Sequence, residues 1–289
     1  MQASQSHIHT VRNLRYHVRT WGNPRATAIF LLHGWMDVSA SFQYLVDCFQ
    51  GDWHVIAPDW RGFGLTEWAR EGYWFPDYYA DLDVLLDIYQ PSAPVNLVGH
   101  SMGGTIACTY AGIRPQRVAR LITMEGLGMP RTTPDTAPAR YEQWLSELRD
   151  PPRFKSYASF DAVAARLKQN NPRLPDEQAR FLAQHWAKPV APGEVALRSD
   201  PRHKIVNPVL SRIEEILACW RRVTAPVLAV SGAESREPAW LADSAAQLAE
   251  RKAAFRDFRE CTLDACGHMM HHDQPEKLAA VIEDFLTRG

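Results

Sequence analysis

Residues Gly99 to Gly103 read G-H-S-M-G and fit the pattern G-x-S-x-G. The motif follows an apolar run at Val95 to Val98 and precedes a stretch of small residues at Met102 to Ile113. Where a strand turns sharply into a helix at such a motif, the serine hydroxyl is lifted above the sheet, and the glycines let the two backbones approach closely. Free N–H groups at the start of the helix can stabilise negative charge on a substrate oxygen. The motif therefore predicts that Ser101 is a nucleophile for acyl transfer.

A histidine near the C-terminus is the candidate general base for this serine. His268 follows Gly267 and a short loop after the apolar run Cys261 to Leu263, and the order nucleophile, acid, histidine is expected along such a chain. His268 and His272 also have the i, i+4 spacing of a helical metal-binding pair, but no Glu follows His268 as the pattern H-E-x-x-H requires. We therefore expect His268 to act as a base, and we expect the protein to need no metal or cofactor.

The sequence His33-Gly34-Trp35 follows another apolar run, Ala28 to Leu32. A backbone N–H at this strand end can form half of an oxyanion hole, and the residue after the nucleophile supplies the other half. The predicted pair consists of the N–H groups of Trp35 and Met102. The neighbouring residues that we expect to contact the substrate are His33, Gly34 and His100.

Short apolar runs that end in turn-forming or polar residues must position these motifs. Such runs predict strands buried on both faces of a parallel sheet, and segments of helical period such as Tyr78 to Tyr89 lie between them. The alternation predicts a doubly wound α/β fold with right-handed connections, whose site lies at the carboxyl ends of the strands. The predicted strands are Ala28 to Leu32, Val55 to Ala57, Val95 to Val98, Leu121 to Met124 and Val227 to Val230.

The strand pattern stops between about Pro130 and Ile213 and resumes near Pro226. Proline is frequent in this region, and three stretches keep a helical period. We therefore expect a helical insertion that forms a cap over the sheet. The expected helices are Ala139 to Leu148, Phe160 to Gln169 and Pro175 to Trp186.

The expected domain organisation follows from this insertion. Residues 1–129 and 216–289 form the two parts of the α/β core, and residues 130–215 form the cap. Aromatic residues of the cap, Trp144 and Trp186 among them, are candidates for an apolar substrate pocket.

The composition gives no support for a nucleic-acid or membrane partner. The 289-residue chain has a formal net charge of −1, and no apolar run approaches the ~20 residues that a membrane span needs. The start of the chain lacks the pattern of a secretory signal, and the five cysteines are scattered without a C-x-x-C pair. We therefore expect a cytoplasmic protein with reduced thiols that acts on a small-molecule acyl substrate. Its oligomeric state stays open, and a homodimer is one option.

Taken together, the motifs resemble those of the α/β-hydrolase superfamily over nearly the whole chain. The matching segments also include residues 58–64, which read P-D-W-R-G-F-G. Within the superfamily the chain resembles the serine hydrolase-like proteins, and the stretch Leu167 to Leu182 is similar to the cap of that group. The resemblance implies an α/β-hydrolase fold with a mostly parallel, doubly wound, eight-stranded sheet.

Two carboxylates compete for the role of the acid that orients His268. In many α/β hydrolases the acid follows the next-to-last strand, and Glu234 lies in the corresponding region here. Glu234 stands one residue before the usual position, which Ser235 occupies, and a one-residue offset can turn a side chain away. Glu125 ends the strand after the elbow helix, where a buried carboxylate needs a partner. These observations leave both candidates open.

A second resemblance favours Glu125. The stretch Thr123 to Pro130 resembles the segment after the sixth strand in haloalkane dehalogenases, where the Glu of a Met-Glu…Pro motif is the triad acid. The dehalogenase activity is not implied, because those enzymes have Asp at the nucleophile position and Trp after it, where this chain has Ser101 and Met102. The resemblance therefore implies Glu125 as the acid, and the departure from it points to acyl transfer to water.

The expected function is hydrolysis of a small or medium carboxylic ester through an acyl-enzyme on Ser101. The alternative is that the same three residues act on a thioester, a lactone or the C–C bond of a meta-cleavage product. A ligand-binding protein without catalysis is a third hypothesis, and the complete set of serine, histidine and acid argues against it.

Overall fold

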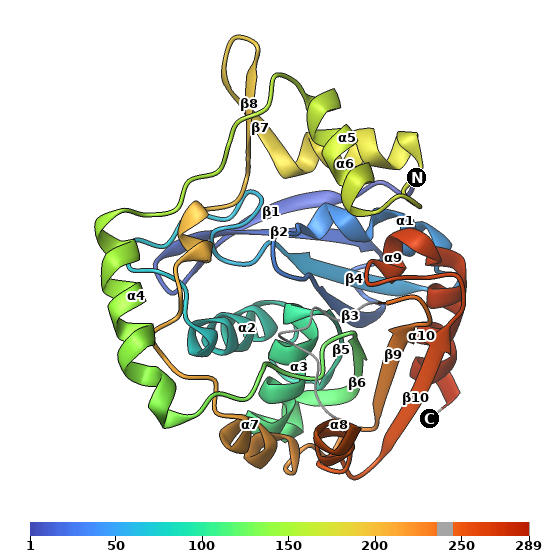
Figure 1. Cartoon of the computed structure of the whole chain (residues 1–289). Helices are drawn as coiled ribbons and strands as arrows, with labels where there is room; N and C mark the ends of the chain where they lie inside the picture. The colour runs from blue at the N-terminus through green and yellow to red at the C-terminus, as the bar shows by residue number, and fades with distance from the viewer. Residues whose placement is uncertain (236–244, 289) are drawn as a thin grey trace.

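The computed structural model describes residues 1–235 and 245–288. In this part of the chain, eight strands form one sheet in the order β1-β2-β4-β3-β5-β6-β9-β10 (Figure 1). β2 is antiparallel to β1 and β4, and the other neighbours are parallel, so the predicted α/β-hydrolase fold is confirmed. The strands are β1 (Gln5–Val11), β2 (Leu14–Gly22), β3 (Thr27–Leu32), β4 (Trp53–Pro58), β5 (Val95–His100), β6 (Val118–Met124), β9 (Val227–Gly232) and β10 (Phe258–Leu263).

Hydrophobic cores cover both faces of the sheet. In β3, Phe30 and Leu32 belong to one core and Ile29 and Leu31 to the other, and all four side chains are fully buried. Burial on both faces explains why this strand reads as a continuous apolar run.

No helix in the described part of the chain is long and apolar enough to cross a membrane. The helices around the sheet are α1 (Gln43–Cys48), α2 (Phe75–Tyr89), α3 (Met102–Ile113), α7 (Ile213–Trp220), α8 (Ala245–Lys252), α9 (Met270–Asp273) and α10 (Pro275–Arg288).

The first two strands form an antiparallel hairpin that the sequence analysis did not predict. Arg12 and Asn13 make its turn with φ values of 47° and 69°. β1 lies at the edge of the sheet, and most of its side chains are exposed or half-buried. An edge strand has one solvated face and carries polar residues, so it lacks the apolar run by which the central strands were found.

Residues 130–215 are inserted between β6 and β9, which are neighbours in the sheet. We call them the inserted segment. Its three helices agree with the predicted ones, but the segment also contains an unpredicted two-stranded hairpin, which turns at Gly193 with a φ of 73°. Figure 1 shows α5, α6 and this hairpin stacked on one side of the main sheet, where they enclose a hydrophobic core of their own. The elements are α4 (Ala137–Arg149), α5 (Phe160–Asn170), α6 (Asp176–Trp186), β7 (Ala187–Ala191) and β8 (Glu194–Leu197).

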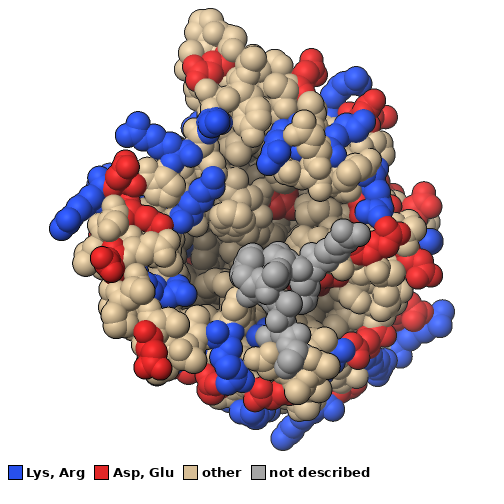
Figure 2. Space-filling model, viewed as in Figure 1, with Lys and Arg blue, Asp and Glu red and all other residues tan. Residues whose placement is uncertain are grey.

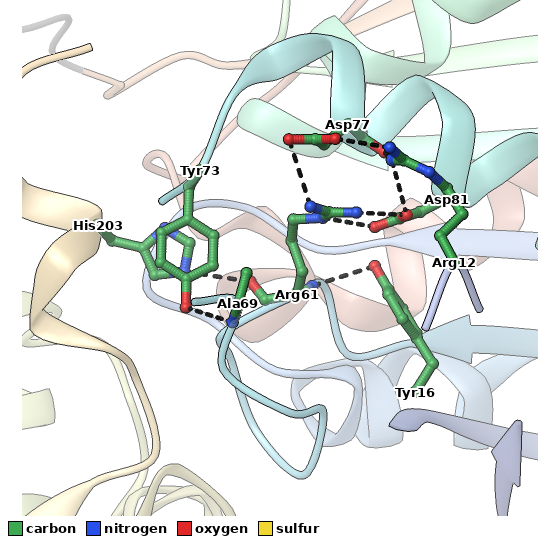
Figure 3. Close-up of polar contacts among 8 residues, drawn as sticks. All are labelled: Arg12, Tyr16, Arg61, Ala69, Tyr73, Asp77, Asp81 and His203. Atoms are coloured by element: carbon green, nitrogen blue, oxygen red, sulfur yellow. Dashed lines mark hydrogen bonds and ion pairs between the residues drawn. The ribbon is translucent and has the colours of Figure 1, made fainter. Parts of the chain in front are cut away.

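Arg61 holds the loop after β4 against α2. Its Nε and Nη2 atoms donate to the two carboxylate oxygens of Asp81 at 2.7 and 2.6 Å, and its Nη1 lies 3.3 Å from Asp77 (Figure 3). The Arg61 backbone N–H donates to Tyr16 Oη at 3.0 Å, and His203 Nε2, from the inserted segment, donates to the Arg61 carbonyl at 3.1 Å. The motif at residues 58–64 therefore braces the core and anchors the inserted segment.

Replacing Arg61 by alanine is expected to lower the free energy of unfolding by about 3–5 kcal/mol, because it leaves the buried Asp81 carboxylate without its main partner. Arg12 also contacts Asp81, at 3.3 Å, but its side chain is 38% exposed. Arg12→Ala is therefore the matched control, and it should cost about 0–1 kcal/mol. Urea denaturation measures both values, and equal losses in the two variants would contradict this assignment.

Candidate active site

Ser101 lies in a strained turn between β5 and α3. Its φ of 51° and ψ of −116° are unusual for a residue other than glycine, and α3 begins at the next residue. A Cβ atom at Gly103 would overlap the Leu32 carbonyl oxygen, so only glycine fits where α3 passes the end of β3. The Ser101 backbone N–H donates to the Met124 carbonyl at 2.7 Å. These contacts fix the serine, which is partly exposed, at the carboxyl end of the central strand.

The loop after β3 packs directly against Ser101. A Cβ atom built on Gly34 would lie 3.2 Å from the Ser101 Cβ atom, so the backbone at Gly34 passes close to the nucleophile. The next residue, Trp35, has a side chain that is half exposed. Met102 is the first residue of α3, where a backbone N–H has no acceptor within the helix. The two predicted oxyanion donors thus belong to segments that meet at Ser101.

His33 is fully buried beneath this loop. Its Nδ1 lies 2.7 Å from the Gly34 carbonyl, to which it donates, and its Nε2 accepts from the Trp60 backbone N–H at 2.8 Å. Burial lowers the pKa of His33, so the ring is neutral and has one proton to donate. Both ring nitrogens are therefore engaged with the backbone, and the ring fixes the shape of the loop rather than facing a substrate.

Glu125 and His268 lie side by side at the ends of different elements. Glu125 follows β6 with a φ of 54°, and its Oε2 atom is 3.9 Å from His268 Nδ1. The carboxylate also accepts hydrogen bonds from the Gly232 backbone N–H at 2.8 Å and from Ser235 Oγ at 2.9 Å. Burial raises the pKa of Glu125, but His268 and these two donors outweigh it and hold the pKa below its usual value. Glu125 is therefore a carboxylate at neutral pH.

The rival acid, Glu234, is half exposed and forms an ion pair with Arg173 of the inserted segment. Ser235, which occupies the usual acid position after β9, donates to Glu125. The segment after β9 therefore supports the Glu125 carboxylate and does not replace it. The structure brings Glu125, and not Glu234, into contact with His268.

His100 connects the turn at Ser101 with the loop that carries His268. His100 is buried, and its Nε2 atom donates to the His268 carbonyl oxygen at 2.8 Å. The two imidazole rings lie 4.7 Å apart between centroids. Because His100 precedes Ser101 in the chain, this contact connects the loop that carries His268 to the turn at the serine. The His268 side chain is 47% exposed.

Asp273 is a supporting residue that the sequence analysis missed. Its side chain is buried, and it accepts hydrogen bonds from the Gly267 backbone N–H at 2.8 Å and from Asn171 Nδ2 at 2.7 Å. Asp273 thus connects the inserted segment to the residue before His268. Nothing in the local sequence around Asp273 indicates this contact, because Asn171 lies 102 positions away along the chain.

The two tryptophans predicted to line a substrate pocket are half-buried residues of the inserted segment. Trp144 lies on α4, and Trp186 ends α6 and packs against the core of the inserted segment. Neither indole N–H has a hydrogen-bond partner among the described residues.

Figure 2 shows that the molecule is hollowed near the centre of the face turned toward the viewer, with basic and acidic residues intermixed around the rim. The charge pattern on this face therefore favours neither a strongly anionic nor a strongly cationic ligand.

Comparison with known proteins agrees with the fold. Residues 27–275 match the model of the family described as the alpha/beta hydrolase fold, and the chain belongs to that family.

Individual relatives resemble the chain over most of its length. A serine hydrolase-like protein from Danio rerio is 26% identical, with 93% of this chain and 84% of the relative covered. A 3-hydroxybutyrate-oligomer hydrolase from Cupriavidus necator is 29% identical, with 78% of each chain covered. The crystal structure of a hypothetical protein from Pseudomonas aeruginosa superposes with a TM-score of 0.86 at 25% identity, covering 98% of this chain and all of that one.

Proposed function

We propose that the protein hydrolyses carboxylic esters of small or medium size through an acyl-enzyme on Ser101. The observation that carries the proposal is the strained turn that presents Ser101 at the start of α3, with the Glu125 carboxylate 3.9 Å from His268 Nδ1. A serine after β5, an ionised acid after β6 and a histidine after β10 are the parts of a nucleophilic triad. The relative from Cupriavidus necator, a 3-hydroxybutyrate-oligomer hydrolase by name, is consistent with hydrolysis of an ester.

In the proposed mechanism, His268 accepts the proton of Ser101 Oγ as the oxygen attacks the ester carbonyl carbon. The backbone N–H groups of Trp35 and Met102 donate to the oxyanion of the tetrahedral intermediate. His268 then protonates the leaving alcohol as the bond between acyl carbon and alkoxy oxygen breaks. In the second half, His268 takes a proton from water, the hydroxide attacks the acyl carbon, and Ser101 leaves with its proton restored.

Glu125 stays ionised throughout and stabilises the charged imidazole by accepting a hydrogen bond from His268 Nδ1. Its present separation of 3.9 Å is longer than a hydrogen bond. Catalytic hydrogen bonds are often long without substrate and tighten in the complex. The donors Gly232 and Ser235 keep the carboxylate oriented and leave it ionised for this purpose.

A panel of substrates tests the proposal. The panel consists of p-nitrophenyl esters of rising acyl length, together with a thioester, a lactone and a meta-cleavage product. We expect saturable turnover of the esters with a burst of p-nitrophenol at the start of the reaction, because acylation of Ser101 releases the phenol before water releases the acid. Turnover confined to the C–C bond substrate, or to the thioester, would replace this proposal by the corresponding alternative. No turnover of any member would favour a binding protein.

A further inference from the structure

Three buried side chains converge behind the proposed catalytic residues. Asp37 lies on the loop that follows β3, His100 ends β5, and His271 lies on α9. One oxygen or nitrogen atom from each lies within 4.8 Å of the other two. The three residues are 2%, 1% and 0% exposed. They therefore form a compact group of possible ligand atoms that solvent does not reach directly.

His100 has an unshared electron pair that no described residue uses. Its Nε2 atom carries a proton, because it donates to the His268 carbonyl. A second proton at Nδ1 would be buried without an acceptor among the described residues, so the ring is neutral. A neutral ring protonated at Nε2 has a lone pair at Nδ1. The His100 Nδ1 atom is buried and hydrogen-bonds to none of the described residues.

Asp37 presents a negative charge to the same place. An aspartate side chain is normally a carboxylate at physiological pH. The Oδ1 atom accepts from the Val38 backbone N–H at 2.9 Å, while the buried Oδ2 atom accepts no hydrogen bond from the described residues. A buried carboxylate oxygen requires a compensating cation or donor.

The separation of Asp37 from His271 is close to the spacing of two ligands on one metal ion. Asp37 Oδ2 lies 3.5 Å from His271 Nε2, whereas charge-assisted hydrogen bonds are about 2.7–2.9 Å long. Ligands at about 2.0–2.1 Å from a tetrahedral zinc ion lie about 3.3 Å from one another. Ser41 Oγ forms a hydrogen bond with His271 Nε2 at 3.2 Å, a contact that a metal ion on this nitrogen would replace. Two imidazoles with a carboxylate are donors that suit zinc and cobalt.

We propose that Asp37, His100 and His271 bind one divalent transition-metal ion of the zinc type. The proposal replaces our expectation from the sequence that the protein needs no metal. The proposed site uses different residues from His268 and His272, the pair whose spacing in the sequence suggested a metal site. It rests on the buried geometry alone, so it stands whether or not Ser101 cleaves esters.

The metal would connect three segments of the candidate active site. Asp37 is two residues from Trp35, His100 adjoins Ser101, and His271 lies three residues after His268. A Cβ atom on Gly34 would lie 3.0 Å from His100 Nδ1, so the loop after β3 also packs on this group. An ion held at this place would fix the relative positions of the oxyanion loop, the nucleophile and the base without touching the substrate. Asp37, His100 and His271 are thus positioning residues.

Metal binding to the full-length protein tests the proposal directly. The chelator-treated protein is titrated with Zn²⁺ and with Co²⁺, whose visible absorption reports coordination geometry. We expect one ion per chain, the intense absorption of four-coordinate Co²⁺, and a melting temperature that rises with Zn²⁺ concentration. Asp37→Asn and His271→Gln should each weaken Zn²⁺ binding by at least about tenfold, the range known even for groups that only support a ligand.

Two further variants serve as controls. His272→Gln alters the neighbouring buried histidine, whose Nε2 bonds to Ser41 Oγ at 2.7 Å, and it should retain stoichiometric binding. His268→Asn should also retain it. Loss of the ion in His268→Asn, or unchanged binding in both Asp37→Asn and His271→Gln, would overturn the proposal. Failure of the wild-type protein to bind a stoichiometric ion at micromolar Zn²⁺ would do so without any variant, and would leave a hydrogen-bonded His271–Asp37 pair.

Discussion

Replacing Ser101 by alanine is expected to lower kcat/KM for p-nitrophenyl esters by about 10⁴-fold or more. The substitution removes only the hydroxyl that forms the acyl bond. The main-chain contacts of the turn, including the bond from the Ser101 N–H to Met124, remain available to alanine. Because the φ of 51° already strains a residue that has a Cβ atom, alanine adds no new backbone cost. The folded state should therefore survive, and steady-state kinetics with a matched thermal melt measures both effects.

The matched control is Ser231→Ala, which removes an exposed serine hydroxyl at the end of β9. Its Oγ atom contacts Thr262 at 3.2 Å and no group of the proposed triad. This variant should retain the kcat/KM of the wild-type protein. Ester hydrolysis that persists at the wild-type rate in Ser101→Ala would assign the activity to another residue.

Glu125→Gln is expected to lower kcat by about 10²–10⁴-fold with a smaller change in KM. A glutamine at this position keeps the size of the side chain but loses the charge that stabilises a protonated His268. Its amide nitrogen can also hydrogen-bond to His268 in the wrong orientation and favour the wrong tautomer. The loss should persist across the pH range of activity, because the lowered pKa of Glu125 keeps the wild-type carboxylate ionised below its usual titration range.

Glu234→Gln tests which of the two candidate acids, Glu125 or Glu234, supports His268. Glu234 pairs with Arg173 at the surface, so its substitution should leave kcat nearly unchanged. An exposed ion pair of this kind contributes only about 0–1 kcal/mol to stability. A loss in Glu234→Gln comparable to that in Glu125→Gln would show that both carboxylates support His268, and a loss in Glu234→Gln alone would reverse the assignment.

The central part of the fold could be predicted from the sequence because its strands are buried on both faces. β3, β5 and β9 each contain an apolar run, and the turn after β5 carries a recognisable glycine pattern. The hairpin of β1 and β2 could not be found in this way, since the edge strand β1 carries polar residues and β2 is interrupted by arginine and histidine. The short β7–β8 hairpin was missed because strands of five and four residues give too little alternation to distinguish from a loop.

The residues of the candidate site also differ in whether local or distant contacts position them, and only the local contacts can be predicted from the sequence. Ser101 is indicated by its five-residue motif, because the strain of the turn is local. The choice between Glu125 and Glu234 depends on which strand end meets His268, and the residues alone do not specify this. The group of Asp37, His100 and His271 is more distant still, because α9 brings a histidine from the C-terminal region against the end of β5. Neither spacing nor composition indicates such a group before the chain is folded.

Labelling by a fluorophosphonate tests most directly whether Ser101 is an activated nucleophile. Such a probe phosphonylates an activated serine with loss of fluoride, and peptide mass spectrometry identifies the modified residue. We predict a single adduct on the peptide that contains Ser101, strongly slowed labelling in His268→Asn, and no labelling of Ser101→Ala. A folded wild-type protein that remains unlabelled, or that is labelled at another residue, would contradict the account.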